Sequence, residues 1–181
     1  MAEIEIKVLD DMPATRAGLR DLLIEAVAAG ASVHFLDPLQ PRDADAFWDG
    51  SIAAAARDER IILGAWDGEV LAGTVTLQLL CPPNQPHRGE IAKMMTRLSH
   101  RGRGVATALL HAAETLAVRH KRNLLVLDTA RDEGASGFYE KHGYILAGEI
   151  PDYALRPHGA LTATMIYWKR ITEALPEMAR S

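Results

Sequence analysis

The sequence predicts an α/β fold in which helices flank one mixed β-sheet, and two features carry this prediction. Residues 61–66 and 69–80 are apolar strand patterns joined by Asp67-Gly68, which is a strong signal for an antiparallel hairpin. Residues 124–127, LLVL, form a short all-apolar run between two helix patterns, which is typical of a central strand with a parallel neighbour. A sheet that contains both kinds of pairing is mixed.

Helices are expected where apolar residues recur every three or four positions between helix-start and helix-stop signals. Pro13 suits the first turn of one helix, and Gly30 follows its end. Another helix begins near Val105. Residues 119–122, RHKR, place positive charges at its C-terminal end, which is the negative end of the helix dipole. The four predicted helices cover residues 13–29, about 42–57, from about 105 to 122, and 135–142.

The remaining strands are predicted from alternation of polar and apolar residues. In residues 90–99 the alternation slips at Met94-Met95, which indicates either a β-bulge or a strand covered on both faces. The other predicted strands are residues 3–9, 144–150 and 161–171. The predicted order is therefore β-α-α-β-β-β-α-β-α-β-β.

Length and composition set limits on the protein class. The 181 residues are 48% hydrophobic and 24% charged, which is ordinary for one globular domain with a real core. We expect that domain to cover residues 1–172 and a short C-terminal tail to cover residues 173–181. No internal repeat, low-complexity tract or linker interrupts the chain.

Several functions are disfavoured by what the sequence contains. The net charge of -4 and the pI near 6.0 give no reason to expect nucleic-acid binding. Cys81 is the only cysteine, and the seven histidines show no metal-ligand spacing, so no metal site is expected. The first residues do not look like a signal peptide, and no apolar run could span a bilayer. A cytoplasmic protein without membrane contact is the expectation.

The segment Arg101-Gly102-Arg103-Gly104 lies directly before a predicted helix. Residues 93–103 contain four Lys or Arg residues and no acid. The unpaired N–H groups and positive dipole end of the helix attract anions, and the two glycines let a ligand approach the backbone. The segment therefore predicts a phosphate or pyrophosphate site, although the same residues would also suit a solvated turn with surface arginines.

Common nucleotide motifs fit this segment poorly. A P-loop needs a Lys-Ser/Thr pair after its last glycine, which is absent here. The dinucleotide pattern G-x-G-x-x-G is partly matched, but Thr107 stands where its third glycine belongs. A dinucleotide-dependent oxidoreductase therefore ranks below the two functional hypotheses that are given at the end of this section.

Two motifs resemble the GNAT superfamily of acetyl-CoA-dependent N-acetyltransferases. Arg101-x-x-Gly104-x-Ala106 resembles its Q/R-x-x-G-x-G/A pyrophosphate loop, and residues 135–144, ASGFYEKHGY, resemble its A-x-x-F/L-Y-x-x-x-G-F/Y segment. Residues 25–35, 124–129 and 148–159 are further similar to the tabtoxin-resistance acetyltransferase group. The resemblance implies a GNAT-like fold whose central mixed sheet is largely antiparallel.

The resemblance also implies a set of site residues. Tyr139 stands where the family places the general acid that protonates the departing thiolate, and packing beside Phe138 is its alternative role. Acetyl-CoA, as co-substrate, would lie in a cleft between the strands of residues 90–99 and 124–127. The residues expected to bind it are Met94, Met95, Thr96, Arg101, Gly102, Arg103, Gly104, Val105 and Ala106.

Acceptor and base residues are predicted less directly. Asp128 follows the run LLVL, and ligands of open α/β sheets bind beyond the carboxyl ends of strands, so it could hold an ammonium or take its proton. A turn or cap is the alternative for Asp128. Glu90 is a second candidate base or a solvent-facing residue. His34 and Phe35 are candidates for the acceptor pocket or ordinary loop residues.

The leading functional hypothesis is an N-acetyltransferase that uses acetyl-CoA to acetylate the amine of a small molecule. The narrower resemblance points to an amino-acid-like antibiotic such as tabtoxinine-β-lactam and hence to antibiotic resistance. A non-catalytic regulatory module that binds CoA or a nucleotide is the alternative. The expected partners are acetyl-CoA and the amine, with a homodimer as an assembly to test, and with neither nucleic acid nor membrane.

Overall fold

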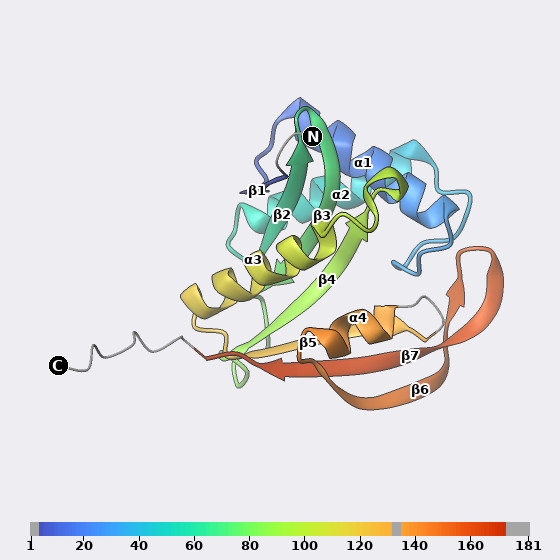
Figure 1. Ribbon diagram of the computed structural model, residues 1–181. Coiled ribbons are helices and arrows are strands. Elements are labelled where there is room, and N and C mark those ends of the chain that lie inside the picture. Colours follow the sequence, from blue (N-terminus) through green and yellow to red (C-terminus); the bar gives the residue numbers. More distant parts are fainter. Residues whose placement is uncertain (1–3, 132–134, 173–181) are drawn as a thin grey trace.

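All strands of the described chain belong to one mixed seven-stranded sheet, and the predicted order of helices and strands is confirmed (Figure 1). The computed structural model describes residues 4–131 and 135–172, so the predicted tail lies outside the described residues. The strands are β1 (Glu5–Val8), β2 (Arg60–Asp67), β3 (Val70–Gln78), β4 (Arg88–Thr96), β5 (Leu124–Ala130), β6 (Ile145–Arg156) and β7 (Gly159–Arg170). The helices are α1 (Pro13–Ala28), α2 (Pro41–Ala55), a 3-10 turn η1 (Leu98–His100), α3 (Val105–Arg119) and α4 (Ala135–Lys141).

The strands lie in the order β1-β2-β3-β4-β5-β7-β6, and every neighbouring pair is antiparallel except β4 and β5. Both sequence signals for the sheet are therefore confirmed. Asp67-Gly68 connects β2 to β3 as a hairpin, with Asp67 opposite Val70. LLVL opens β5, whose neighbour β4 runs parallel to it.

Two apolar cores cover the two faces of the sheet. The first lies under α3 and α4 and includes Val75, Leu77, Leu109, Leu125 and Tyr167. The second lies under α1 and α2 and includes Leu19, Leu22, Leu23, Trp48 and Ile62. All of these side chains are at most 2% exposed. Burial of each large side chain stabilises the fold by about 1.5–3 kcal/mol.

Helix α1 also fixes the end of β4. The Glu25 carboxylate accepts hydrogen bonds from the Arg97 guanidinium (2.6 Å) and from the backbone N–H of Leu98 (2.8 Å). Arg97 in turn donates to the Leu71 carbonyl of β3 (2.8 Å). These bonds tie the segment that leads into α3 to two other elements, so the start of α3 has a defined place.

The last two strands are longer than the sequence indicated. The strand predicted at residues 144–150 extends through Pro151 to Arg156, and its partner begins at Gly159. The register breaks between Ile150 and Ala154, which is where Pro151 lies. Strand β6 is the edge of the sheet, where a proline that cannot donate to a ladder is tolerated. Among the described helices, none is long and apolar enough to cross a membrane.

Candidate functional site

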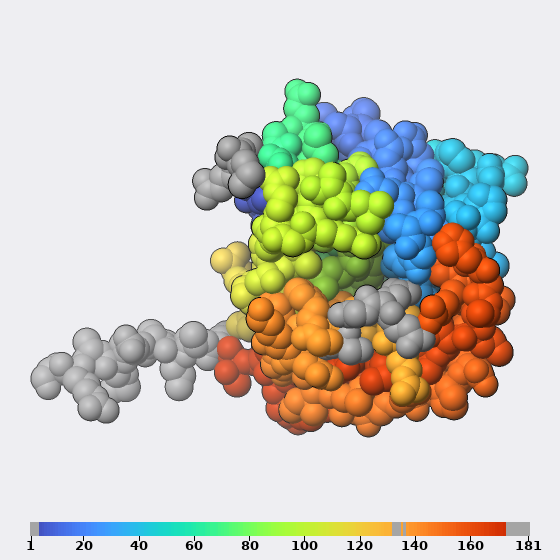
Figure 2. All heavy atoms as spheres, turned by 45° about the vertical axis from the view of Figure 1, so that its right-hand side comes forward, coloured from blue at the N-terminus to red at the C-terminus, as the bar shows by residue number. Residues whose placement is uncertain are grey.

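The parallel strands β4 and β5 separate soon after they meet. Their pairing covers only residues 88–90 of β4 and residues 124–126 of β5. From Ile91 onward β4 pairs with β3 alone among the described strands. The sheet therefore opens into a cleft, as the resemblance implied, and the surface is hollowed between the start of α3 and α4 (Figure 2).

A β-bulge lies on the cleft side of β4. Thr76 of β3 pairs with Ala92 and Thr74 pairs with Met95, so two residues of β4 lie opposite one residue of β3, and Lys93 has a φ of 51°. The bulge interpretation of Met94-Met95 is therefore confirmed. Its consequence is that Met94 faces the cleft region, whereas Met95 is 4% exposed within the α1–α2 core.

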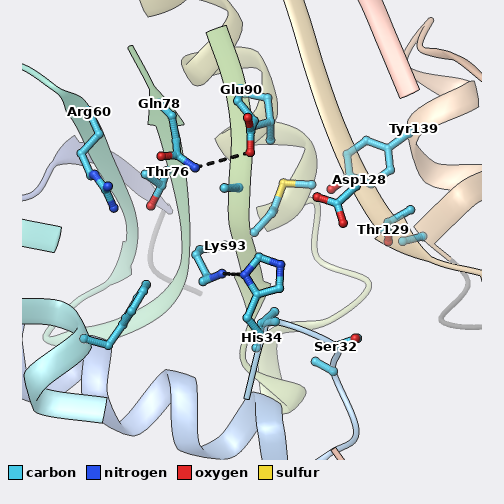
Figure 3. Close-up of a pocket in the computed structure, with 17 residues that line it drawn as sticks. Ser32, His34, Arg60, Thr76, Gln78, Glu90, Lys93, Asp128, Thr129 and Tyr139 are labelled. Carbon is cyan, nitrogen blue, oxygen red and sulfur yellow. Dashed lines mark hydrogen bonds between the residues drawn. The ribbon is translucent and has the colours of Figure 1, made fainter. Parts of the chain in front are cut away.

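A cavity of about 330 Å³, the central cavity, lies where the strands separate (Figure 3). It is lined by residues of β2, β3, β4, β5, α2 and α4 and of the loop after α1. Its polar lining consists of Ser32, His34, Arg60, Thr76, Gln78, Glu90, Lys93, Asp128, Thr129 and Tyr139. The cavity thus contains two cations, two carboxylates and one histidine.

Asp128 lies inside β5 rather than after it, because the strand continues to Ala130. The turn or cap role that was its alternative is therefore wrong. Its carboxylate accepts a hydrogen bond from the Thr164 hydroxyl on β7 (3.1 Å). The residue as a whole is exposed and lines the central cavity, so its carboxylate is accessible to a ligand.

Tyr139 projects from α4 into the same cavity, and its hydroxyl lies on the side of Asp128 (Figure 3). The side chain is only 6% exposed and packs its ring against Phe138, Tyr144 and Tyr167. Burial, and to a smaller extent the Asp128 charge, raises the pKa of Tyr139 well above its usual range. The hydroxyl therefore keeps its proton throughout the physiological pH range.

Lys93 joins β4 to the loop after α1. Its Nζ lies 2.9 Å from Nδ1 of His34 and 5.5 Å from the centre of the Phe47 ring. Burial lowers the pKa of Lys93 to about 8, with the Arg60 charge adding to that effect and Asp128 and Glu90 opposing it. Burial and the Lys93 charge also lower the pKa of His34. His34 is therefore neutral at pH 7, and its Nδ1 can accept a hydrogen bond from the Lys93 ammonium.

The buried ammonium of Lys93 should make stability depend on pH. The unfolded chain has an ordinary lysine pKa of about 10.4, so between about pH 8 and 10 it binds more protons than the folded chain. Wild-type stability therefore gains a contribution as the pH rises through this window. Lys93→Met has no titrating group at this position and lacks this contribution. We therefore expect the melting temperature of Lys93→Met, measured relative to that of wild type at the same pH, to fall from pH 7 to pH 10. A constant or growing difference in thermal melts would contradict this.

Of the other residues predicted to act as base or to bind the acceptor, Glu90 and His34 line the central cavity and Phe35 does not. Glu90 lines the central cavity, and its carboxylate contacts Nε2 of Gln78 (3.5 Å) and the guanidinium of Arg88 (3.6 Å). His34 also lines it. Phe35 does not line the central cavity and packs edge-on against Phe47, which does (5.3 Å between ring centres). Phe35 thus supports the wall instead of forming it.

A second concavity of about 260 Å³, the α3 hollow, lies at the start of α3. Gly104 caps the helix with a left-handed backbone (φ 80°), and the first helical hydrogen bond runs from Ala108 N to Gly104 O. The N–H groups of residues 105–107 precede this bond and are available to an anion. The residues that line the hollow are Thr96, His100, Arg101, Gly102, Gly104, Val105, Ala106, Thr107 and Phe138.

Arg103 is the member of the predicted loop that does not line the α3 hollow. Its guanidinium donates to the Asp67 carboxylate (2.8 Å), which also lies 3.2 Å from Nε2 of His100. The hydrogen bond from Arg103 holds the pKa of Asp67 below its usual range. Arg103 thus anchors the loop to the β2–β3 hairpin, while Arg101 remains exposed beside the hollow.

The two concavities are neighbours along the cleft. On β4, Met94 lines the central cavity and Thr96 lines the α3 hollow. On α4, Tyr139 lines the central cavity and the adjacent Phe138 lines the α3 hollow. An elongated molecule can therefore have an anionic group at α3 and its other end beside Tyr139. Among the described residues, no cluster of His, Cys, Asp and Glu could hold a metal ion.

Sequence reasoning missed Arg60, Thr76, Gln78 and Lys93. They lie on three strands and have no common motif, and only the sheet register brings them to one side of the cavity: Arg60 lies opposite Gln78, and Gln78 opposite Glu90. A signal was present in the polar residues at alternate positions of apolar strands. It could not be used before the strand order was known.

Comparisons with known proteins agree with this geometry. The profile of the acetyltransferase (GNAT) family matches residues 24–144. An uncharacterized N-acetyltransferase of Escherichia coli K12, YedL, is 28% identical over 141 residues, which cover 76% of this chain and 86% of that protein.

Solved structures share the fold at lower identity. The putative acetyltransferase yncA from Salmonella typhimurium, solved with its cofactor acetyl-CoA, has a TM-score of 0.77 at 15% identity and covers 99% of this chain and 100% of its own. A putative phosphinothricin N-acetyltransferase has a TM-score of 0.75 at 18% identity, over 94% and 100% of the two chains.

Proposed function

Because the chain belongs to the acetyltransferase (GNAT) family and is an acetyl-CoA-dependent N-acetyltransferase, we propose that it acetylates the primary amine of a small molecule bound in the central cavity. The observation that carries this proposal is the accessible carboxylate of Asp128 beside the protonated hydroxyl of Tyr139. A cavity of about 330 Å³ suits a small acceptor.

The α3 hollow and the open edge of β4 fit acetyl-CoA. Backbone N–H groups at the start of α3, with Arg101 beside them, would hold the pyrophosphate. The open edge of β4 at residues 94–96 offers backbone groups to the pantetheine arm. When bound, acetyl-CoA supplies an acetyl thioester whose sulfur leaves as a thiol.

Asp128 and Tyr139 have complementary roles in this proposal. The Asp128 carboxylate binds the acceptor ammonium and takes a proton from it, which frees the nitrogen lone pair for attack on the acetyl carbon. The Tyr139 hydroxyl donates its proton to the departing sulfur, and the second proton that the nitrogen loses as the amide forms restores the hydroxyl. Glu90 is a second carboxylate that can accept the proton, and Lys93 and His34 border the acceptor.

Amino-acid-like antibiotics such as tabtoxinine-β-lactam are the acceptors we place first. The similarity of residues 25–35 and 148–159 to the tabtoxin-resistance group supports this choice. Phosphinothricin is a second candidate because a putative phosphinothricin N-acetyltransferase shares the fold. Both belong in an acceptor panel alongside ordinary amino acids and simple amines.

A screen of this panel with acetyl-CoA, followed by detection of the free thiol, tests the proposed function. We expect amine-dependent thiol release and a product whose mass is increased by one acetyl group. Tight acetyl-CoA binding without turnover across the panel would instead support the alternative of a non-catalytic CoA-binding module.

The Asp128→Asn variant should reduce turnover about a hundredfold, because a positioned general base is typically worth that much or more. Its acetyl-CoA affinity should remain near that of wild type, since the α3 hollow does not include Asp128. Turnover, acetyl-CoA affinity and melting temperature are measured on one preparation. A lower melting temperature with unchanged activity per folded molecule would mean that Asp128 only supports β7 through Thr164.

A further inference from the structure

Two buried polar atoms on one wall of the central cavity have no hydrogen-bond partner among the residues that the structure describes. They are Nε of Arg60 and the hydroxyl oxygen of Thr76, and both residues line the cavity. Thr76 is only 2% exposed. An unpaired buried polar atom costs about 1–3 kcal/mol and is rare in folded proteins. Such a pair beside a cavity points to a ligand that completes the hydrogen bonds.

The sheet places these two residues on the same face. Arg60 lies opposite Gln78, and Thr76 lies two residues before Gln78 on β3, so Arg60 and Thr76 are diagonal neighbours. One guanidinium nitrogen of Arg60 donates to the Ser51 hydroxyl (3.1 Å), which orients the group. Arg60 and Thr76 lie across the cavity from Asp128 and Tyr139, with Lys93 between (Figure 3).

The positive charge on this wall comes from Arg60. Arg60 forms no ion pair with a carboxylate of the described residues, and its charge helps to lower the pKa of Lys93. The neighbouring Glu59 carboxylate binds Arg57 at 2.7 and 2.9 Å, and its pKa is lowered mainly by that bond and less by Arg60. An anion at Arg60 would reduce the repulsion between Arg60 and Lys93.

We infer that Arg60 and Thr76 form a carboxylate subsite, so that the acceptor is a zwitterionic amino acid or a close analogue of one. The guanidinium and the Thr76 hydroxyl donate to the acceptor carboxylate while Asp128 holds its ammonium. Arginine suits this role because its planar donors match a carboxylate. The inference rests on the proposed function and adds to it a charged group that the acceptor must carry.

Matched acceptors that differ by the carboxylate test this subsite. The pairs are L-methionine with 3-(methylthio)propylamine, L-phenylalanine with phenethylamine, and L-lysine with cadaverine. For the pair that reacts best, we expect kcat/KM to be at least tenfold higher for the amino acid. Arg60→Gln should reduce that ratio to near one, Arg60→Lys should restore part of it, and Thr76→Val should reduce it several-fold.

Two control variants separate recognition from folding. Arg57→Gln removes an exposed arginine bound to Glu59 outside the cavity, and Ser51→Ala removes the hydroxyl that orients Arg60 while it leaves the guanidinium in place. Both should keep most of the ratio. A ratio unchanged in Arg60→Gln, or a wild-type preference for the decarboxylated amines, would overturn the subsite while the proposed function stands.

Binding measurements decide the case in which no amine reacts and the proposed function fails. Calorimetry compares N-acetyl-L-methionine with N-acetyl-3-(methylthio)propylamine on wild type and Arg60→Gln. A carboxylate-dependent affinity that Arg60→Gln abolishes would support the subsite without any turnover. Equal affinity for both compounds, or no binding of either, would overturn it.

Discussion

The Gly104→Glu variant should bind acetyl-CoA at least about a hundredfold more weakly than wild type, which corresponds to about 2.8 kcal/mol at 1.4 kcal/mol per tenfold change. Gly104 caps α3, and the N–H groups that follow it face the α3 hollow. A glutamate there adds a negative charge and bulk where the pyrophosphate would approach. Calorimetry with CoA at low and high salt measures the loss, which should shrink in high salt because screening weakens the repulsion.

Backbone strain must be separated from this charge effect, because Gly104 has a φ of 80° that disfavours any side chain. Gly104→Ala carries the same strain with only a methyl group, which would meet open space. Gly159→Glu carries the same charge and a similar strain (φ 91°) at the start of β7. Both controls should bind CoA within several-fold of wild type. Unchanged CoA affinity in a folded Gly104→Glu protein would place the pyrophosphate elsewhere.

The order of elements could be predicted because each of its signals is local. The Asp67-Gly68 turn and the run LLVL each lie within a few consecutive residues, and these short-range patterns gave the hairpin and the parallel strand. The second half of β6 was missed for the same reason. Pro151 and Asp152 look like a turn that ends the strand, and only the pairing of the residues after them with β7 on the sheet edge makes them a strand.

Residues of the candidate site were predictable to the extent that they lie in contiguous motifs. Gly102, Gly104 and Tyr139 belong to such motifs, and each lines one of the two concavities. Arg103 shows the limit of this reasoning. A cation in an anion-binding loop is expected to face the anion, but the carboxylate of Asp67, 36 residues earlier in the sequence, binds it instead.

The cationic side of the central cavity could not be predicted from the sequence. Arg60 and Lys93 lie on different strands, and the bulge that gives Lys93 its positive φ also decides where β4 stops pairing regularly with β3. The Met94-Met95 pattern indicated that bulge without indicating which side chain it would turn toward the loop after α1. Contacts between distant segments, such as Lys93 with His34, follow only from the assembled fold.

Replacement of Tyr139 by phenylalanine should lower kcat by roughly tenfold to a hundredfold while acetyl-CoA affinity changes little. The phenyl ring keeps the contacts with Phe138, Tyr144 and Tyr167, so the variant loses the hydroxyl alone. The proton is needed only as the thiolate departs, so its loss affects the transition state more than the ground state. Steady-state kinetics with a reactive amine and calorimetry with CoA measure the two quantities.

The pH profile adds a second test of Tyr139. A tyrosine with an ordinary pKa near 10 would cause a falling limb at high pH, but burial raises the pKa of Tyr139 beyond that range. We therefore expect Tyr139→Phe to lower kcat uniformly between about pH 7 and 10. Tyr144→Phe is the matched control, because Tyr144 is also buried and packs on Tyr139 but does not line the central cavity. Wild-type turnover in Tyr139→Phe, or an equal loss in Tyr144→Phe, would make Tyr139 a packing residue and not the acid.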